Sequence, residues 1–135
     1  MRRLTVVVAV FALVVGACGG SDDSIRSGGG PPVSLAGTTN DHGTATATAG
    51  LAMELDDFYF GPTFVRATAG QSFTMELENE GKEPHTFTSA ALGVDELLEP
   101  GQKRTVTITA PQSGVALFTC RLHQGLGMQG AVVVS

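Results

Sequence analysis

The sequence predicts an all-β domain, a sandwich or barrel of short antiparallel strands, over residues 51–135. Apolar residues there recur with a period of two: Phe73, Met75 and Leu77 alternate with polar neighbours, and so do Val106 and Ile108. This period places successive side chains on opposite faces of a strand. Turns that contain glycine or proline separate the segments at short intervals, which is typical of sandwiches and barrels. The 85 residues are enough for one small core.

Seven strands are expected in this domain, and Met53 and Met75 are expected to fill its core. The expected strands are 52–58, 63–68, 71–79, 84–88, 104–110, 115–120 and 130–134. The stretch 94–99 is ambiguous, and we allow that it forms a helical turn. Phenylalanines in and beside the strands supply the bulk for a single hydrophobic core.

The N-terminus has the layout of a secretory signal peptide. Arg2 and Arg3 precede an uncharged apolar stretch at 4–15, and small residues lead to Cys18. This ending resembles the lipobox of bacterial lipoproteins, which implies cleavage after residues 1–17 and a diacylglyceryl lipid on Cys18. An ordinary signal peptide or an uncleaved anchor is the alternative.

Residues 18–50 are expected to form a lipid-anchored, flexible linker. Gly, Ser, Thr and Ala dominate, and no hydrophobic periodicity is present. Such a composition buries too little apolar surface to offset the entropy of ordering. His42 lies in this stretch and is expected to be a solvated linker residue, with a weak accessory role in metal binding as the alternative.

The charge of the chain argues against nucleic acid as a partner. The whole sequence has a formal net charge of −5. Loss of residues 1–17 removes two of eight basic side chains and leaves six against 13 acidic ones, a charge of −7. Nucleic-acid phosphates require clusters of Lys and Arg. The acidity is compatible with a soluble protein that docks to a basic partner.

The most specific pattern is a set of four side chains: His85, Cys120, His123 and Met128. One thiolate, two imidazoles and one thioether are the ligands of a blue-copper electron-transfer site. His123 and Met128 follow Cys120 by three and eight positions in a glycine-rich loop between two expected strands. Glycines allow such a loop to turn tightly, so its side chains can converge, while His85 comes from another strand.

Alternative roles for these residues are less consistent with the sequence. Cys120 could be a buried small hydrophobe, but lipid on Cys18 would leave it without a disulfide partner outside the cytoplasm. Zinc has little use for a thioether, and an iron–sulfur cluster requires more thiolates. A dinuclear copper centre of the oxidase type would need a second cysteine in the loop. One copper ion is therefore the expected cofactor.

The run 120–130, CRLHQGLGMQG, resembles the copper loop of the plastocyanin-like cupredoxins, and Asn79-Glu80-Gly81 with Pro84-His85 resembles their first-histidine segment. The resemblance implies a Greek-key β-sandwich of about seven to eight short strands. It also implies that His85, Cys120 and His123 are equatorial ligands and Met128 the long axial one. Leu122 replaces the usual proline, and Thr86 replaces an asparagine that braces the cysteine loop in many members.

The resemblance implies a one-electron carrier that passes its electron through the exposed edge of His123. Leu122 and Leu126 would form the apolar surface around that edge, unless they fill the core. We expect a monomer that is lipid-anchored to the bacterial cell membrane, on its periplasmic or outer face. A membrane cytochrome or oxidase is the expected redox partner.

A copper-binding or delivery protein without electron-transfer duty is the alternative function, and an interaction module is a third. Enzymatic turnover is not expected, because the chain has three histidines in all, too few for the further copper clusters of oxidases and nitrite reductases. The acidic pairs Asp56-Asp57 and Asp95-Glu96 are expected to be turn or surface residues rather than catalytic groups.

Overall fold

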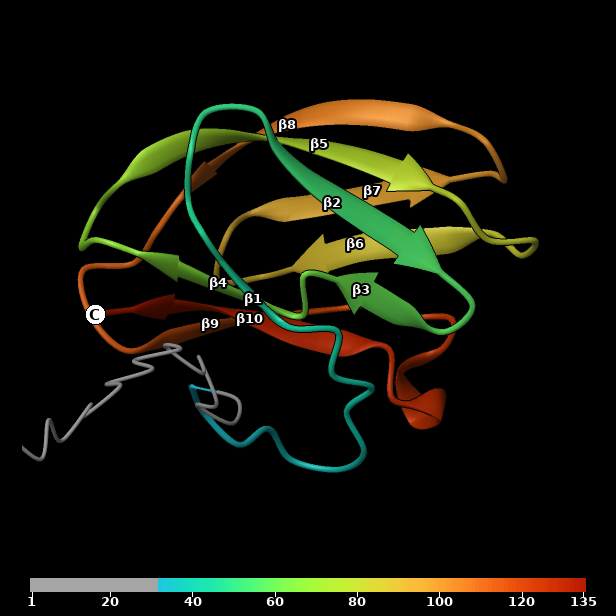
Figure 1. The fold of residues 1–135 in the computed structure, drawn as a ribbon, viewed down its shortest axis with the longest axis horizontal. Coiled ribbons are helices and arrows are strands. Elements are labelled where there is room, and N and C mark those ends of the chain that lie inside the picture. The colour runs from blue at the N-terminus through green and yellow to red at the C-terminus, as the bar shows by residue number, and fades with distance from the viewer. Residues whose placement is uncertain (1–31) are drawn as a thin grey trace, which may run out of the picture.

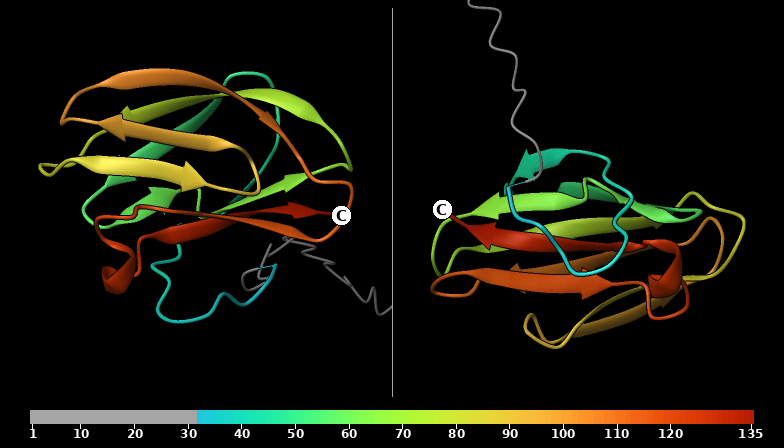
Figure 2. Two further views of the ribbon diagram at one scale, coloured as in Figure 1. Left: turned by 180° about the vertical axis from the view of Figure 1, so that it is seen from behind. Right: turned by 90° about the horizontal axis from the view of Figure 1, so that it is seen from below.

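The computed structural model describes residues 32–135, and these form ten β-strands in two facing sheets (Figures 1 and 2). The six-stranded sheet has the order β1 (Thr44–Thr46), β4 (Phe64–Ala67), β10 (Gln129–Val134), β9 (Val115–Thr119), β6 (His85–Ser89) and β7 (Val94–Leu98). The four-stranded sheet has the order β3 (Tyr59–Gly61), β2 (Leu51–Asp56), β5 (Ser72–Asn79) and β8 (Lys103–Thr109). The predicted all-β sandwich is confirmed.

The core lies between the two sheets and follows the alternation seen in the sequence. Met53 and Met75 are buried as expected. Phe60, Phe87 and Phe118 form an aromatic cluster, with ring centroids 4.7 to 5.8 Å apart. Aromatic rings bury the largest apolar area per residue, so this cluster accounts for much of the packing between the sheets.

Strand order brings distant segments of the chain together at one end of the sandwich. β6 and β9 are neighbours in the six-stranded sheet, with Thr88 opposite Thr119. The loop from β9 to β10 contains a single 3-10 turn, Gln124–Leu126, drawn in red in Figure 1. His85, at the start of β6, therefore lies near the loop that follows Cys120.

Two expected elements differ from the observed ones. Residues 94–98 form strand β7 rather than a helical turn, because they pair antiparallel with all of β6. The segment expected as one strand at 52–58 is divided, since β2 ends at Asp56 and β3 begins at Tyr59. The chain reverses at Asp57 and Phe58, so β2 and β3 pair antiparallel.

The expected linker boundary at residue 50 is also corrected. Strand β1 pairs in parallel with β4, with Ala45 opposite Val65, so the folded unit begins well before residue 51. Strand β1 has three residues, too few to show an alternating pattern in the sequence. The expected signal peptide and Cys18 lie outside the described residues. Within 32–135, no helix has the length and apolar character needed to cross a membrane.

Candidate metal centre

Three of the four predicted ligands meet at one end of the sandwich. His85 opens β6 and is completely buried, and Cys120, also buried, directly follows β9. His123 is half-buried in the loop three residues later. The backbone N–H of His123 donates to the carbonyl of Cys120, at 3.1 Å, which turns the loop back on itself.

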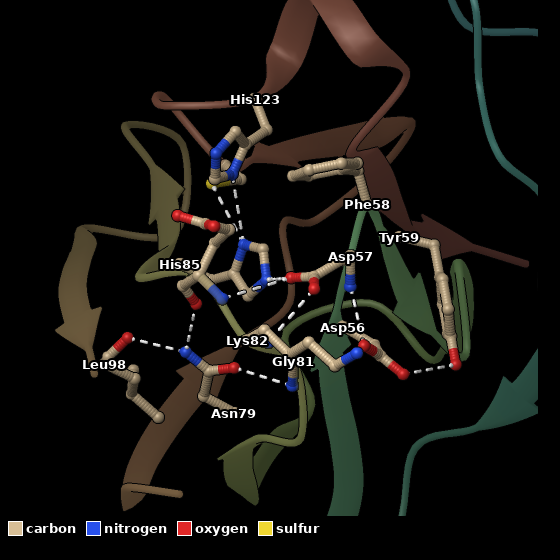
Figure 3. Close-up of polar contacts among 12 residues, drawn as sticks. Asp56, Asp57, Phe58, Tyr59, Asn79, Gly81, Lys82, His85, Leu98 and His123 are labelled. Carbon is tan, nitrogen blue, oxygen red and sulfur yellow. Dashed lines mark hydrogen bonds and ion pairs between the residues drawn. The ribbon is translucent and has the colours of Figure 1, made fainter. Parts of the chain in front are cut away.

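The donor atoms of these side chains face one another. The Nδ1 atoms of His85 and His123 are 3.1 Å apart. Sγ of Cys120 is 3.5 Å from Nδ1 of His123 and 3.9 Å from Nδ1 of His85. The close-up in Figure 3 shows one ring nitrogen of His85 directed at His123 and the other at Asp57. Both histidines thus present the same ring atom to the thiol.

These separations suit a single metal ion. Metal–nitrogen and metal–sulfur bonds of about 2.0 and 2.3 Å place two nitrogen donors of one ion at most about 4.0 Å apart, and a nitrogen and a sulfur donor at most about 4.3 Å apart. The observed N–N distance of 3.1 Å and the N–S distances of 3.5 and 3.9 Å are all shorter than these limits. The donor set of thiol and two imidazoles, buried at the end of a sandwich, therefore fits a copper ion.

Met128, the fourth predicted ligand, lies at the far end of the loop. It is fully buried, and its carbonyl accepts a hydrogen bond from the backbone N–H of Cys120, at 3.0 Å. Gly127, immediately before it, has a φ of 89°, a conformation that side chains other than glycine rarely adopt. The turn at Gly127 brings Met128 back beside Cys120 at the start of β10.

The environment of Cys120 favours the thiolate, which is the form that binds metal. Burial by itself raises the pKa of this thiol. Hydrogen bonds from His85, from the backbone N–H groups of Thr86 and Leu122, and from His123 outweigh burial and lower the pKa to about 6. The N–H of Thr86 lies 3.3 Å from Sγ.

The Thr86 side chain also contacts the copper loop. Its Oγ1 accepts a hydrogen bond from the N–H of Arg121 at 3.0 Å and lies 3.0 Å from Oγ1 of Thr88. The Thr88 hydroxyl is 2.8 Å from Oδ1 of Asp95, which Arg121 also contacts at 3.1 Å. A short polar chain therefore links β6, β7 and the residue after Cys120.

The turn between β2 and β3 contributes two residues that the sequence did not reveal. Oδ1 of Asp57 is 2.8 Å from Nε2 of His85, although Asp57 was expected to be a surface turn residue. The ring of Phe58 packs against that of His123, with centroids 4.6 Å apart. Asp57 and His85 are 28 positions apart in the chain, so no local sequence pattern could have predicted their contact.

Charge and hydrogen bonding affect both members of the Asp57–His85 pair. The backbone N–H of Lys82 is the main group that lowers the pKa of Asp57, and His85 adds to this. Burial alone would lower the pKa of His85, but the hydrogen bonds with Cys120 and Asp57 raise it overall.

The segment before β1 contacts the copper loop. The side-chain amide of Asn40 donates to the carbonyls of Phe58 and Leu126, at 2.8 and 2.9 Å. The amide of Gln129 donates to the carbonyls of Ala36 and Thr38, at 2.8 and 2.9 Å. Residues 36–40 therefore hold the loop in place, a role that their linker-like composition does not suggest.

His42 is not part of the donor cluster. Its ring stacks on Tyr59, with centroids 3.4 Å apart and planes 6° from parallel. Among the described residues, the group of His, Cys, Asp or Glu side chains close enough to hold a metal consists of His85, Cys120 and His123. The aromatic contact explains the position of His42 without a metal.

Comparison with known proteins agrees with the fold. The family model of the cupredoxin-like domain matches residues 33–134. No curated protein sequence matches the chain significantly.

Solved structures with the same fold include a dithionite-reduced auracyanin from Roseiflexus castenholzii, 19% identical with a TM-score of 0.56, over 66% of this chain and 98% of that one. Auracyanin A, a blue copper protein from Chloroflexus aurantiacus, is 21% identical with a TM-score of 0.53, over 69% of this chain and all of that one. A laccase-like multicopper oxidase from Ochrobactrum sp. is 19% identical with a TM-score of 0.55, over 72% of this chain but only 30% of that one.

The fold and the donor set together identify the cofactor. A cupredoxin sandwich with His, Cys, His and Met close together at one end forms a type 1 copper site. The match to the family model covers residues 33–134, from before β1 to the end of β10. The chain belongs to the cupredoxin-like family.

Proposed function

We propose that this protein is a blue-copper electron carrier, and that His85, Cys120, His123 and Met128 would hold its copper ion. The observation that carries the proposal is the convergence of two imidazole Nδ1 atoms and one thiol sulfur, 3.1 to 3.9 Å apart. Copper, when bound, supplies a one-electron Cu(II)/Cu(I) couple. Soft sulfur donors suit Cu(I) and imidazoles suit Cu(II), so this donor set serves both oxidation states.

The surroundings of the ligands support fast electron exchange. Hydrogen bonds that involve Thr86, Asn40 and Asp57 hold the elements that carry the donors. A site whose ligands are held in position needs little rearrangement when its charge changes. The same hydrogen bonds to sulfur and imidazole tune the electron density of the ligands.

The surface around His123 supports docking of a redox partner. Leu122 and Leu126 are 51% and 54% exposed, so they do not fill the core. They flank His123, the more exposed of the two histidines in the cluster. Redox encounters use small, transient interfaces, and an apolar patch of this size next to a ligand suits one. A membrane cytochrome or oxidase is the partner we propose.

Tethering would place this carrier next to such a partner. We propose that residues 1–17 are a lipoprotein signal peptide and that Cys18 carries a lipid, which locates the domain outside the cytoplasm. An anchor confines the protein to a layer near the membrane and raises its effective concentration there. Incorporation of a radiolabelled fatty acid into the wild-type protein, and its loss in Cys18→Ala, would test this part of the proposal.

Enzymatic turnover is not part of the proposed function. Two of the three histidines in the chain belong to the cluster, and His42 stacks on Tyr59. A single site of this kind moves electrons without a second copper centre at which a substrate would react. The similarity to a multicopper oxidase concerns the fold.

Electron exchange measures the proposed function directly. The copper-loaded domain should exchange electrons rapidly with a membrane fraction that contains cytochromes and oxidases, and Leu122→Asp should slow the exchange. Leu117→Asp is the matched control, because Leu117 is 50% exposed but lies on β9, away from the loop. Slow exchange with every fraction, together with easy loss of copper to a chelator, would instead indicate copper binding or delivery.

A further inference from the structure

The imidazole of His85 is held at both ring nitrogens. Nδ1 faces the donor atoms of Cys120 and His123, and Nε2 is 2.8 Å from Oδ1 of Asp57. The His85 side chain has no exposed surface, whereas 23% of the Asp57 side chain is exposed. Asp57 therefore lies between solvent and the buried histidine, with one carboxylate oxygen directed at the ring (Figure 3).

The carboxylate of Asp57 is itself held by the loop between β5 and β6. The backbone N–H of Lys82 donates to Oδ2 at 3.0 Å, and the N–H of Glu83 approaches Oδ1 at 3.4 Å. Two backbone donors restrict rotation of the carboxylate. The β2–β3 turn is thereby joined to the segment that leads into His85.

Gly81 lies against the hydrogen-bonded side chains of Asp57 and His85, where there is no room for a side chain. A Cβ atom at this position would lie 2.5 Å from Oδ1 of Asp57 and 2.7 Å from Nε2 of His85. Both distances are far shorter than real Cβ contacts. Absence of a side chain at position 81 is therefore a requirement of the hydrogen bond between Asp57 and His85.

The chemistry of a ligand histidine gives this contact a role. When Nδ1 presents its lone pair to a metal, the ring proton resides on Nε2, where it needs an acceptor. A carboxylate acceptor fixes the tautomer and the orientation of the ring, and it increases the basicity of the ligating nitrogen. Increased basicity stabilises Cu(II) more than Cu(I), because the higher charge draws more on the donor.

We propose that Asp57 is a positioning residue for His85. Its carboxylate accepts a hydrogen bond from the Nε2–H of His85, fixes the ring for metal binding and lowers the reduction potential of the site. The proposal rests on the proposed function, since it assigns His85 as a copper ligand. It adds a carboxylate from the β2–β3 turn to the residues that determine the potential.

Voltammetry of the copper-loaded protein tests the effect on the potential. Loss of such a partner typically reduces metal affinity about 10- to 100-fold. If Asp57→Asn weakens Cu(II) binding by this factor and leaves Cu(I) binding unchanged, the potential rises by about 59 mV for each tenfold loss. Asp56→Asn is the control, because it removes the same charge one residue away and Asp56 contacts Tyr59 and the backbone N–H of Asp57, but not His85. The amide oxygen of asparagine can still accept from that N–H, so the β2–β3 turn should be retained.

Gly81→Ala tests the hydrogen bond between Asp57 and His85 without removing the negative charge of Asp57. The new Cβ pushes Asp57 and His85 apart while the carboxylate remains, so the potential should rise as in Asp57→Asn. Nitrogen-15 NMR of the diamagnetic Cu(I) form gives a second readout. In the wild-type protein, we expect a slowly exchanging proton on Nε2 of His85, and faster exchange of this proton in both variants.

The outcomes distinguish this proposal from the proposed function. Equal potentials in Asp57→Asn and Asp56→Asn would overturn it. If Asp57→Asn does not fold, the wild-type NMR spectrum decides, and rapid exchange of the Nε2 proton overturns the proposal. Blue colour in the variants shows that copper is still bound at its thiolate, whereas a colourless wild-type protein would contradict the proposed function itself.

Discussion

The side-chain oxygen of Thr86 accepts a hydrogen bond from the backbone N–H of Arg121, with 3.0 Å between the two atoms. Thr86 follows His85 on β6, and Arg121 follows Cys120 in the copper loop. One hydroxyl thus joins the two segments that supply the buried donors of the site. Where many cupredoxins of the plastocyanin type use an asparagine, this chain uses a shorter side chain for the same connection.

Replacement of Thr86 by valine should weaken this connection. Valine has nearly the same shape but no oxygen, so the partly buried N–H of Arg121 loses its acceptor. A hydrogen bond typically contributes about 0.5–1.5 kcal/mol, and we expect the free energy of unfolding to fall by that amount. Urea denaturation of the copper-free domain measures it. Thr86→Ser keeps the hydroxyl, and a loss as large in this variant would show that the bond is unimportant.

Replacement by alanine should affect the stability of the protein very differently at two glycines, one in the copper loop and one at the start of β10. A Cβ at Gly130 would collide with the carbonyl of Thr63 and with the ring of Phe118, whereas a Cβ at Gly125 has no atom within 4 Å. Overpacking of a core typically costs about 1–3 kcal/mol, occasionally more. We expect a large decrease in the urea midpoint for Gly130→Ala and little change for Gly125→Ala. Similar midpoints in the two variants would contradict close packing of Thr63 and Phe118 against Gly130.

The segment before β1 should contribute to the stability of the copper loop. Asn40→Ala removes two hydrogen bonds, to Phe58 and Leu126, each worth about 0.5–1.5 kcal/mol. We expect lower stability and faster release of copper to a chelator. Asp41→Ala is the control, because among residues 32–135 its carboxylate accepts a hydrogen bond from Gly43 alone. Equal release rates in the two variants would argue against a bracing role for Asn40.

Period-two alternation was sufficient to predict the sandwich and its core methionines. The ligand types pointed to four side chains, of which the fold brings His85, Cys120 and His123 together. The three-residue strands β1 and β3 are too short to show alternation, so the linker boundary and the turn at Asp57 were missed. Asp57 and His85 are 28 positions apart. Only the pairing of strands brings such residues together, and a single sequence contains no record of that contact.

The thiol of Cys120 should titrate well below its usual range in the copper-free protein. Hydrogen bonds outweigh burial and lower its pKa from 9.0 to about 6. The unfolded chain binds more protons than the folded one between these values, so this group by itself favours folding increasingly as pH rises from about 6 to 9. His85, whose pKa is raised, acts in the opposite direction. Ultraviolet thiolate absorbance is therefore the appropriate measurement, with a midpoint near pH 6 expected. A midpoint near pH 9 would contradict this.

The visible spectrum of the protein after addition of Cu(II) tests the central claim most directly. A thiolate bound to Cu(II) in this donor set gives an intense blue charge-transfer band. We expect the wild-type domain to show this band and Cys120→Ala to lack it, with both proteins folded by circular dichroism. A wild-type protein that binds Cu(II) but stays colourless, or a Cys120→Ala variant that turns blue, would contradict the assignment of a type 1 copper site.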